Sequence, residues 1–215
     1  MAVITISRQY GSGGDEIASQ LCELLGYRYF DKSMMAQVAS DMGLSSKEVI
    51  DSPEDRHQVF GFLDRLFGQK VAEAWESRDE VSGARTVELG ELDSKSFVAT
   101  LRSIVQTAYE QGDVVILGRG GQVILRDQPG VLRVRIEAPF EERVRRVREQ
   151  QRFTSLEAAR DFVAGRDRAG ADYLRTYYKV DWNEPELYHL MINTGLWSLE
   201  AAAHIIVDAL KYLST

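Results

Sequence analysis

Glycines crowd one short stretch near the start of the chain, where a phosphate group could be bound. Gly11, Gly13 and Gly14 fall within four residues, after an apolar run and before an amphipathic helical pattern. Glycine lets the backbone take conformations that a Cβ atom would forbid. A turn of this kind that leads into a helix directs backbone N–H groups and the positive end of the helix dipole to one point, which suits a phosphate. The spacing alone fits a plain strand–helix connection equally well.

The turn follows the outline of a nucleotide-binding P-loop, whose signature is G-x-x-x-x-G-K-[ST]. With Gly13 as the second glycine, Arg8 stands in the position of the first glycine. Gly14 then replaces the lysine and Asp15 the serine or threonine. Asp15 and Glu16 stabilise an empty helix N-terminus, but they repel a triphosphate unless Mg²⁺ bridges them. The residues predicted on this donor side are Arg8, Gly11, Ser12, Gly13, Gly14, Asp15 and Glu16.

A second candidate is Arg119, which follows the apolar run 114–117 and has glycines on both sides. The carboxyl ends of strands are the places where α/β sheets bind ligands. The flanking glycines leave room for the guanidinium to reach an anion, although a structural arginine at a turn fits the same pattern. We favour contact with a ligand.

A third group of basic residues comes later in the chain, at Arg166, Arg168 and Arg175. Arg168 and Arg175 are seven residues apart and share one face of a continuous helix, whereas Arg166 lies on a different side. A solvated helix face explains this spacing. A set of arginines that closes over a polyphosphate explains it equally well.

The helix predicted after Pro139 carries five further arginines. Glu141–Arg145 and Glu142–Arg146 are i,i+4 pairs of the kind that decorate any exposed helix. We therefore interpret these arginines as a solvated face.

Short apolar runs alternate with helical patterns along the chain, joined by short links. This alternation predicts an α/β fold, a parallel sheet with helices on both faces. The run 132–137 alternates apolar with charged residues, which predicts a strand with one solvated face or at an edge. The strands are expected at about 3–7, 27–30, 114–117, 132–137 and 187–193.

Length and composition fit a single α/β domain of 215 residues with an inserted subdomain. The net charge of −7 argues against a general binder of nucleic acid or membrane surfaces. No stretch approaches 18 apolar residues, and a strand begins directly after Met1, so we expect a cytoplasmic protein. The single cysteine, Cys22, is interpreted as a small buried apolar residue.

The segment 43–95 differs from the rest, with apolar residues at helical spacing followed by a polar stretch at 78–93. Phe60 and Phe62 lie off the apolar stripe. They could mark the face of a homodimer, although additional core is the simpler explanation.

Six short motifs occur in an order that resembles one family. The motifs are Ile-Ser-Arg-Gln-Tyr-Gly-Ser-Gly-Gly at 6–14, Phe30-Asp31-Lys32, Gly118-Arg119-Gly120, the arginine group at 166–175, Asp181-Trp182 and Ile192-Asn193-Thr194. Together they resemble the cytidylate kinase-like family, P-loop relatives of the nucleoside monophosphate kinases. The resemblance extends from about residue 3 to 210 and is weakest across 43–95.

The resemblance implies a P-loop fold with a helical insert at 43–95 and an arginine-bearing lid at 153–182. Gly11 to Gly14 would hold the donor phosphates of ATP, with Arg8 nearby. Asp31 and Lys32 would face a nucleoside monophosphate pocket formed partly by the insert, and Arg119 would bind the acceptor phosphate. The lid arginines Arg166, Arg168 and Arg175 would close over the γ-phosphoryl group.

Two functions follow. The first is a Mg²⁺-dependent phosphotransferase that moves the γ-phosphoryl of ATP to a nucleoside monophosphate, cytidylate-like, or to another small phosphorylated acceptor. The second is a catalytically degenerate relative that binds a nucleotide or another anion as a regulatory or scaffold protein. The basic residues favour the first, whereas Gly14, Asp15 and Glu16 favour the second, because true cytidylate kinases carry the P-loop lysine.

Overall fold

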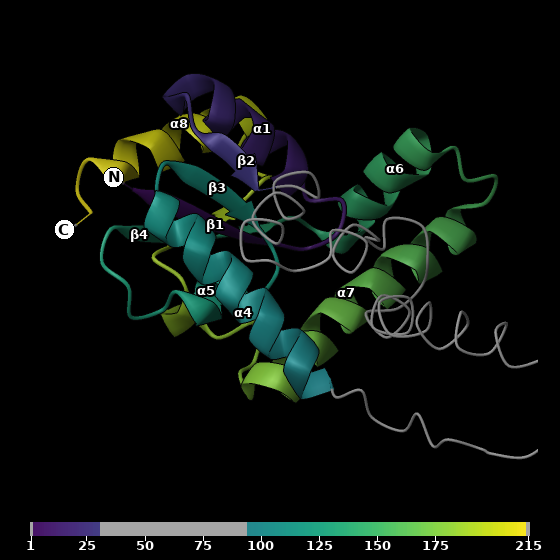
Figure 1. The fold of residues 1–215 in the computed structure, drawn as a ribbon. Helices are drawn as coiled ribbons and strands as arrows, with labels where there is room; N and C mark the ends of the chain where they lie inside the picture. The colour runs from purple at the N-terminus through teal and green to yellow at the C-terminus, as the bar shows by residue number, and fades with distance from the viewer. Residues whose placement is uncertain (1, 31–93, 214–215) are drawn as a thin grey trace, which may run out of the picture. The chain divides into compact units, whose positions relative to one another are not determined.

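The computed structural model of the protein describes residues 2–30 and 94–213. The chain divides into two compact units, one made of Met1–Asp31 and Val105–Thr215 and the other of Lys32–Ile104. The candidate site described below belongs to the first unit (Figure 1). Asp31, Lys32, the two phenylalanines and residues 43–93 of the predicted insert lie outside the described residues, so what the sequence indicates about them stays a prediction.

The described residues of the first unit form a parallel five-stranded sheet, as the sequence predicts. The strand order is β2-β3-β1-β4-β5, and every neighbouring pair is parallel. Because the strands run the same way, the segments that follow β1 and β3 leave the same edge of the sheet. The strands are β1 (Val3–Arg8), β2 (Arg28–Phe30), β3 (Val114–Leu117), β4 (Val131–Glu137) and β5 (Leu190–Asn193).

Helices cover both faces of this sheet (Figure 1). Two of them, α1 and α8, pack together on one face. On the opposite face lie α5 and the part of α4 from Val105 onward, where Val105 and Ala108 are fully buried. The helices are α1 (Gly14–Leu25), α4 (Ser94–Gln111), α5 (Gly121–Ile124), α6 (Phe140–Gln151), α7 (Leu156–Tyr178) and α8 (Leu199–Leu210).

The main core lies between the sheet and the α1–α8 layer. Ile17 and Leu21 of α1 meet Ile206 of α8 above the apolar residues of β1, β3 and β4. Cys22 packs partly buried against this core, and burial, aided by Glu23, raises the pKa of its thiol to about 11. The thiol is therefore protonated at neutral pH, in agreement with its interpretation as a small apolar side chain.

The prediction for the strand at 132–137 is wrong in one respect. This strand, β4, is neither an edge strand nor solvated on one face, because it lies between β1 and β5. Arg135, one of its charged residues, is 0% exposed. Alternating charge predicts exposure, whereas the buried Arg135 is paired with protein groups that the local pattern does not reveal. The last strand is also shorter than predicted and begins at Leu190, after a short 3-10 helix at Pro185–Leu187.

The helices α6 and α7 form a pair beside the sheet (Figure 1). They pack through Val144 and Val147 of α6 and Ala159 and Val163 of α7. The α7 helix begins at an N-cap, Ser155, whose hydroxyl accepts a hydrogen bond of 3.0 Å from the N–H of Ala158. One continuous helix therefore makes up most of the predicted lid region, 153–182, and closure of a lid stays a prediction.

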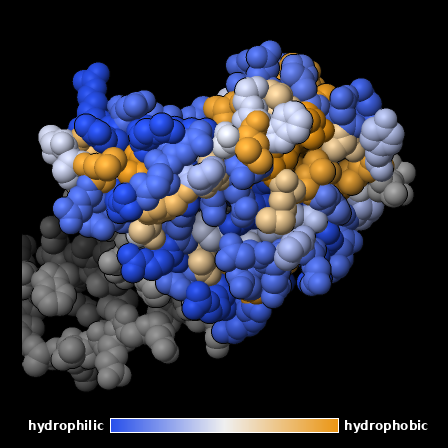
Figure 2. Space-filling view, turned by 180° about the vertical axis from the view of Figure 1, so that it is seen from behind, coloured by the Kyte–Doolittle hydropathy of each residue, from blue (hydrophilic) through white to orange (hydrophobic). Residues whose placement is uncertain are grey.

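On the face shown in Figure 2, hydrophilic residues predominate, and apolar residues gather in patches among them. Within the described ranges, none of the helices combines the length and the apolar character needed to span a membrane.

Candidate functional site

The connection between β1 and α1 is a tight turn that requires glycine at two positions. Gly11 and Gly13 have φ angles of 76° and 84°, in the left-handed region that favours glycine. A Cβ atom at Gly11 would lie 2.6 Å from Cγ2 of Val147, and one at Gly13 would lie 2.4 Å from Cδ2 of Leu199. Backbone angle and space together explain both glycines, and Gly13 becomes the N-cap of α1.

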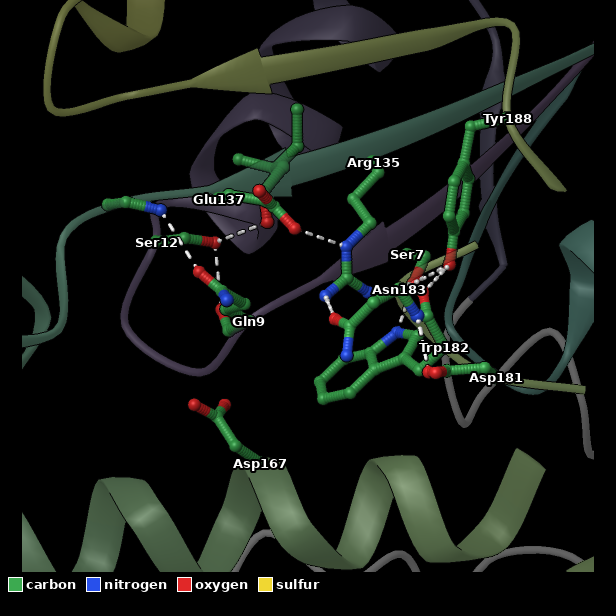
Figure 3. Close-up of polar contacts among 12 residues, drawn as sticks. Ser7, Gln9, Ser12, Arg135, Glu137, Asp167, Asp181, Trp182, Asn183 and Tyr188 are labelled. Carbon is green, nitrogen blue, oxygen red and sulfur yellow. Dashed lines mark hydrogen bonds and ion pairs between the residues drawn. The ribbon is translucent and has the colours of Figure 1, made fainter. Parts of the chain in front are cut away.

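Hydrogen bonds from β4 and from the residue after β5 fix the shape of this turn. The N–H of Gln9 donates to the carbonyl of Ile136 at 3.0 Å, and its side-chain oxygen accepts from the N–H of Ala138 at 3.2 Å. The Ser12 hydroxyl contacts the carbonyls of Gln9 and Ile136 at 2.7 and 3.2 Å (Figure 3). The carbonyl of Ser12 accepts from the Thr194 hydroxyl at 2.6 Å. The side chain of Ser12, buried at 0% exposure, therefore shapes the turn from inside.

The first turn of α1 presents backbone donors. A helix leaves its first N–H groups without intrahelical partners. Among the described residues, no hydrogen bond uses the N–H of Gly14, Asp15 or Glu16. Together with the helix dipole, these donors make the N-terminus of α1 a favourable place for a phosphate group.

Arg8, the last residue of β1, lies across this helix N-terminus. A Cβ atom built on Gly14 would lie 2.6 Å from Cβ and 2.7 Å from Cγ of Arg8. One built on Gly118 would lie 2.7 Å from Nη1 of Arg8. The Nη2 atom is 3.5 Å from Oδ1 of Asp15, and the Arg8 side chain is 33% exposed. The guanidinium thus lies between the N-terminus of α1 and the turn after β3, and it is partly exposed to solvent.

The turn after β3 brings Arg119 to the same edge of the sheet. Gly118, Arg119 and Gly120 have φ angles of 70°, 59° and 72°, so three successive residues are left-handed. The N–H of Gly118 donates to the carbonyl of Ile6 at 2.8 Å, which joins this turn to β1 next to the P-loop. Arg119 therefore lies in a left-handed turn beside the β1–α1 connection, and its contact with a ligand stays a prediction.

The end of α7 closes one side of the Arg119 turn. A Cβ atom on Gly120 would lie 2.9 Å from the ring of Tyr178, whose hydroxyl is 3.3 Å from that of Tyr173. Burial and Tyr178 raise the pKa of Tyr173, while the positive charge of Arg119 opposes this rise. The Tyr173 hydroxyl is thus a neutral hydrogen-bonding group at physiological pH.

The three predicted lid arginines occupy different environments on α7. The guanidinium of Arg166 lies 5.1 Å from the ring centroid of Tyr10, so this residue contacts the P-loop. Arg168 is exposed. Arg175 is also exposed and forms an ion pair of 3.3 Å with Asp172 of the same helix. The structure brings one lid arginine to the P-loop and leaves the other two at the surface of α7.

Sequence reasoning missed a clamp between α6, α7 and the P-loop. The carboxylate of Asp167 points from α7 toward the loop (Figure 3) and accepts a hydrogen bond of 2.9 Å from the N–H of Tyr10. Its other oxygen accepts from Arg143 at 2.7 Å. Arg143 also donates to the carbonyls of Tyr10 and Ala138, both at 3.0 Å. One buried arginine and one aspartate thus hold the backbone of the loop at Tyr10.

The interpretation of the α6 arginines as a solvated face is therefore wrong for Arg143, which is 4% exposed. The sequence contains a signal for this burial. Arg143 follows Phe140 by three residues and precedes Val147 by four, so it lies on the apolar stripe of the helix that also includes Val144. Of the two predicted pairs, Glu142 does form an ion pair with Arg146.

A second missed feature is a cluster around the buried Arg135 below the loop. Its Nε donates to Glu137 at 2.7 Å, its Nη2 to Asn183 at 3.1 Å and its Nη1 to the hydroxyl of Ser7 at 3.3 Å. Its guanidinium carbon lies 4.3 Å from the ring centroid of Trp182 (Figure 3). All three guanidinium nitrogens have partners, which makes a buried charge tolerable.

The same cluster ties the segment after α7 to β1. The indole N–H of Trp182 donates to the Ser7 hydroxyl at 2.6 Å, and the Tyr188 hydroxyl donates to the carbonyl of Trp182 at 2.8 Å. Burial raises the pKa of Tyr188, although Ser7 and Arg135 oppose the rise. Ser7 immediately precedes Arg8, so the cluster fixes the strand end from which the P-loop starts.

Comparison with known proteins identifies the family of this chain. A family model described as the cytidylate kinase-like family matches residues 3–196. The chain belongs to the cytidylate kinase-like family. It is 25% identical over 208 residues to a protein named cytidylate kinase from Halobacterium salinarum, covering 96% of this chain and 88% of that protein. A cytidylate kinase from Pyrococcus horikoshii is 25% identical over 212 residues, covering 98% and 89%.

Solved structures resemble this cytidylate kinase-like protein in fold. An uncharacterized protein from Eubacterium ventriosum has a TM-score of 0.63 at 19% identity, covering 98% of this chain and 99% of that one. A shikimate kinase from Bacteroides thetaiotaomicron has a TM-score of 0.50 at 11% identity, with 98% of each chain covered. The fold is thus that of the P-loop kinases, as the sequence predicts.

Proposed function

We propose that this member of the cytidylate kinase-like family is a Mg²⁺-dependent phosphotransferase that moves the γ-phosphoryl group of ATP to a nucleoside monophosphate. A cytidylate-like nucleotide is the first acceptor to test, and another small phosphorylated acceptor is the second. The observation that carries the proposal is the meeting of three features at one sheet edge: the P-loop backbone, the N-terminus of α1 and the guanidinium of Arg8 beside Gly118.

The reaction needs positioning more than covalent help from the protein. A non-bridging oxygen of the acceptor phosphate attacks the γ-phosphorus, and the bond to the β–γ bridging oxygen breaks. The electron pair of that bond leaves with ADP, and no proton has to move when the acceptor phosphate is a dianion. The N–H groups of Gly14, Asp15 and Glu16 would bind donor phosphate oxygens, and Arg119 would bind the acceptor phosphate.

The magnesium ion would arrive with the nucleotide. Among the described residues there is no group of three or more His, Cys, Asp or Glu side chains that could hold a metal by itself. The carboxylate of Asp15, 60% exposed at the position of the P-loop serine or threonine, is a hard oxygen ligand that suits Mg²⁺. The ion would neutralise the phosphate charge that Asp15 and Glu16 otherwise repel.

The lid arginines Arg166, Arg168 and Arg175 would complete the site when α7 closes on the bound nucleotide. A well-placed arginine that stabilises charge on the transferring phosphoryl group is worth about 10³–10⁵ in rate. Arg166 already contacts the ring of Tyr10 in the loop, so it is the first of the three arginines to test for this role.

The second candidate function is a nucleotide- or anion-binding regulatory or scaffold protein without turnover. Gly14 in place of the lysine and the carboxylates of Asp15 and Glu16 favour it. A homodimer formed through the insert stays a separate prediction, and Phe60→Asp should dissociate it in sedimentation experiments.

A thermal-shift panel of nucleoside mono-, di- and triphosphates, each with and without Mg²⁺, tests these functions. A ligand at a hundred times its Kd stabilises a fold by about 2.7 kcal/mol, which is readily seen as a higher Tm. A Mg²⁺-dependent shift with a triphosphate and an additive shift with one monophosphate support the kinase and identify the pair for a transfer assay. Shifts without transfer favour the regulatory protein. No shift with any nucleotide contradicts both nucleotide-binding proposals.

A further inference from the structure

We propose that Arg8 replaces the missing P-loop lysine, so that the first glycine and the lysine of the P-loop signature have in effect exchanged places. The sequence places an arginine where the first glycine is expected and a glycine where the lysine is expected. The inference rests on the proposed function, because it assigns Arg8 to the β- and γ-phosphates of the donor nucleotide.

The two side-chain positions occupy the same space. A side chain at position 14 would begin 2.6 Å from Cβ and 2.7 Å from Cγ of Arg8. Contacts below 3.0 Å are essentially never made by a real Cβ atom, and Gly14 follows directly on the turn. The stem of Arg8 therefore runs where the stem of a lysine at position 14 would start. An arginine at 8 requires a glycine at 14, and a lysine at 14 requires a small residue at 8.

The Arg8 side chain places its positive charge beside the backbone N–H donors of α1. Its guanidinium lies next to Gly118 on one side and 3.5 Å from the Asp15 carboxylate on the other. That separation is longer than a charge-assisted hydrogen bond, and both side chains are partly exposed, so the pair is weak. Arg8 can exchange Asp15 for phosphate oxygens, which a guanidinium binds in a bidentate manner.

Two other arginines near the loop are unsuited to this role. Arg135 and Arg143 are 0% and 4% exposed, and their guanidinium groups donate to protein oxygens. Moving either one to a phosphate would break several buried hydrogen bonds. Arg8, at 33% exposure with one weak ion pair, can reach a ligand without that loss.

The test uses the full-length protein and measures the Kd for ATP with Mg²⁺ by titration calorimetry, with a nucleoside monophosphate in parallel. Four variants are compared: Arg8→Met, Arg8→Lys, Gly14→Lys and the exchange Arg8→Gly/Gly14→Lys, with Arg8→Gly alone as its reference. Arg28→Met is the matched control, because Arg28 begins β2 at the opposite edge of the sheet and bonds Gln111 and the carbonyl of Gly112. Circular dichroism and Tm verify folding.

We expect Arg8→Met to weaken ATP binding about tenfold or more, the range for a charge-assisted hydrogen bond, and to leave the monophosphate largely unaffected. Arg8→Lys should weaken ATP binding less than Arg8→Met does. Gly14→Lys alone should bind no better than the parent, because its stem collides with Arg8, whereas the exchange should bind ATP at least about tenfold better than Arg8→Gly. The Gly14→Lys substitution should thus improve ATP binding only when Arg8 is also replaced by glycine, as exchanged positions predict.

Two results overturn the inference, and they differ from each other. If the parent binds ATP and folded Arg8→Met binds it equally well, Arg8 is not the missing cation, and the proposed function survives. If the parent protein binds no nucleotide, the proposed function fails and the role of Arg8 falls with it. Should Arg8→Gly fail to fold, the comparison of Arg8→Met with Arg8→Lys decides.

Discussion

Two sets of arginines, on the strands and helices that lead to and from the loop, differ in almost every physical respect. Arg135 and Arg143 are buried and bonded to several protein groups each. Arg8 and Arg175 are partly or largely exposed and have one weak or screened ion pair each, and Arg168 is exposed. Residue type does not distinguish an arginine that shapes the loop from one that is accessible to a ligand. The burial of the side chain and the number of its hydrogen-bonding partners distinguish the two kinds of arginine.

The energetic reason is desolvation. A buried charge costs several kcal/mol unless its partners compensate, so removing one partner leaves an unfavourable group behind. An exposed ion pair contributes only about 0–1 kcal/mol, because solvent and salt screen it. Substitutions in the buried set should therefore act on stability and those in the exposed set on ligands.

Arg135→Met should have the largest effect. It leaves Glu137 and Asn183 without their buried partner and should lower the free energy of unfolding by about 3 kcal/mol, measured by urea denaturation. Arg168→Met is the matched control and should change it by less than about 0.5 kcal/mol. Equal effects of the two substitutions would remove the distinction between the buried and exposed sets.

Arg143→Met and Asp167→Asn should show strong coupling, because the two side chains share one bond of 2.7 Å and both contact Tyr10. In a double-mutant cycle we expect a coupling free energy of about 1–3 kcal/mol. The same variants should weaken nucleotide binding, since the loop loses its fixation at Tyr10. Additive effects on unfolding would show that the clamp does not act as a unit.

Arg119→Ala should alter stability little, because alanine and arginine bear a similar strain at a φ of 59°. The variant should lose the melting shift caused by the monophosphate, with affinity lower by about tenfold or more, and keep the shift caused by the triphosphate. Arg8→Met should show the reverse pattern. If the monophosphate shift survives Arg119→Ala, the assignment of Arg119 to the acceptor is wrong.

Arg168→Ala and Arg175→Ala should leave the free energy of unfolding within about 0.5 kcal/mol of the parent. If α7 closes as a lid, each should lower the rate of phosphoryl transfer while leaving the Kd of the separate nucleotides nearly unchanged. A transfer assay at saturating substrates measures this. A rate equal to that of the parent in both variants would restrict the lid role to Arg166.

The smallest effect concerns His189, whose Nδ1 accepts a hydrogen bond of 3.1 Å from the N–H of Arg133. Burial and the charge of Arg133 lower the pKa of His189, so the unfolded chain binds a proton more readily than the folded one. The contribution of neutral His189 to the free energy of unfolding is therefore present above the unfolded pKa of about 6.5, and it decreases as the pH falls below that value. The urea midpoint should fall slightly from pH 7.5 to pH 5, and His189→Gln should reduce that fall.

The position of the candidate site was available from local sequence. The β1–turn–α1 pattern with Gly11 and Gly13 locates the candidate phosphate turn, because backbone angles and helix starts depend on neighbouring residues. The buried run 114–117 followed by Gly118-Arg119-Gly120 locates the second turn for the same reason. In a parallel sheet such turns share an edge, so the pattern also predicts that they lie together.

The roles of the arginines were decided only by tertiary structure. Arg135 sits in an alternating pattern typical of an exposed strand, and its partners Ser7, Asn183 and Trp182 lie far away in the sequence. Arg8 and Gly14 are close in sequence, yet their competition for one space becomes visible only when the turn is folded. Local sequence specified the turns and strands, because their conformational preferences are local. Burial, charge pairing and shared space join distant residues, and the packed fold alone determined them.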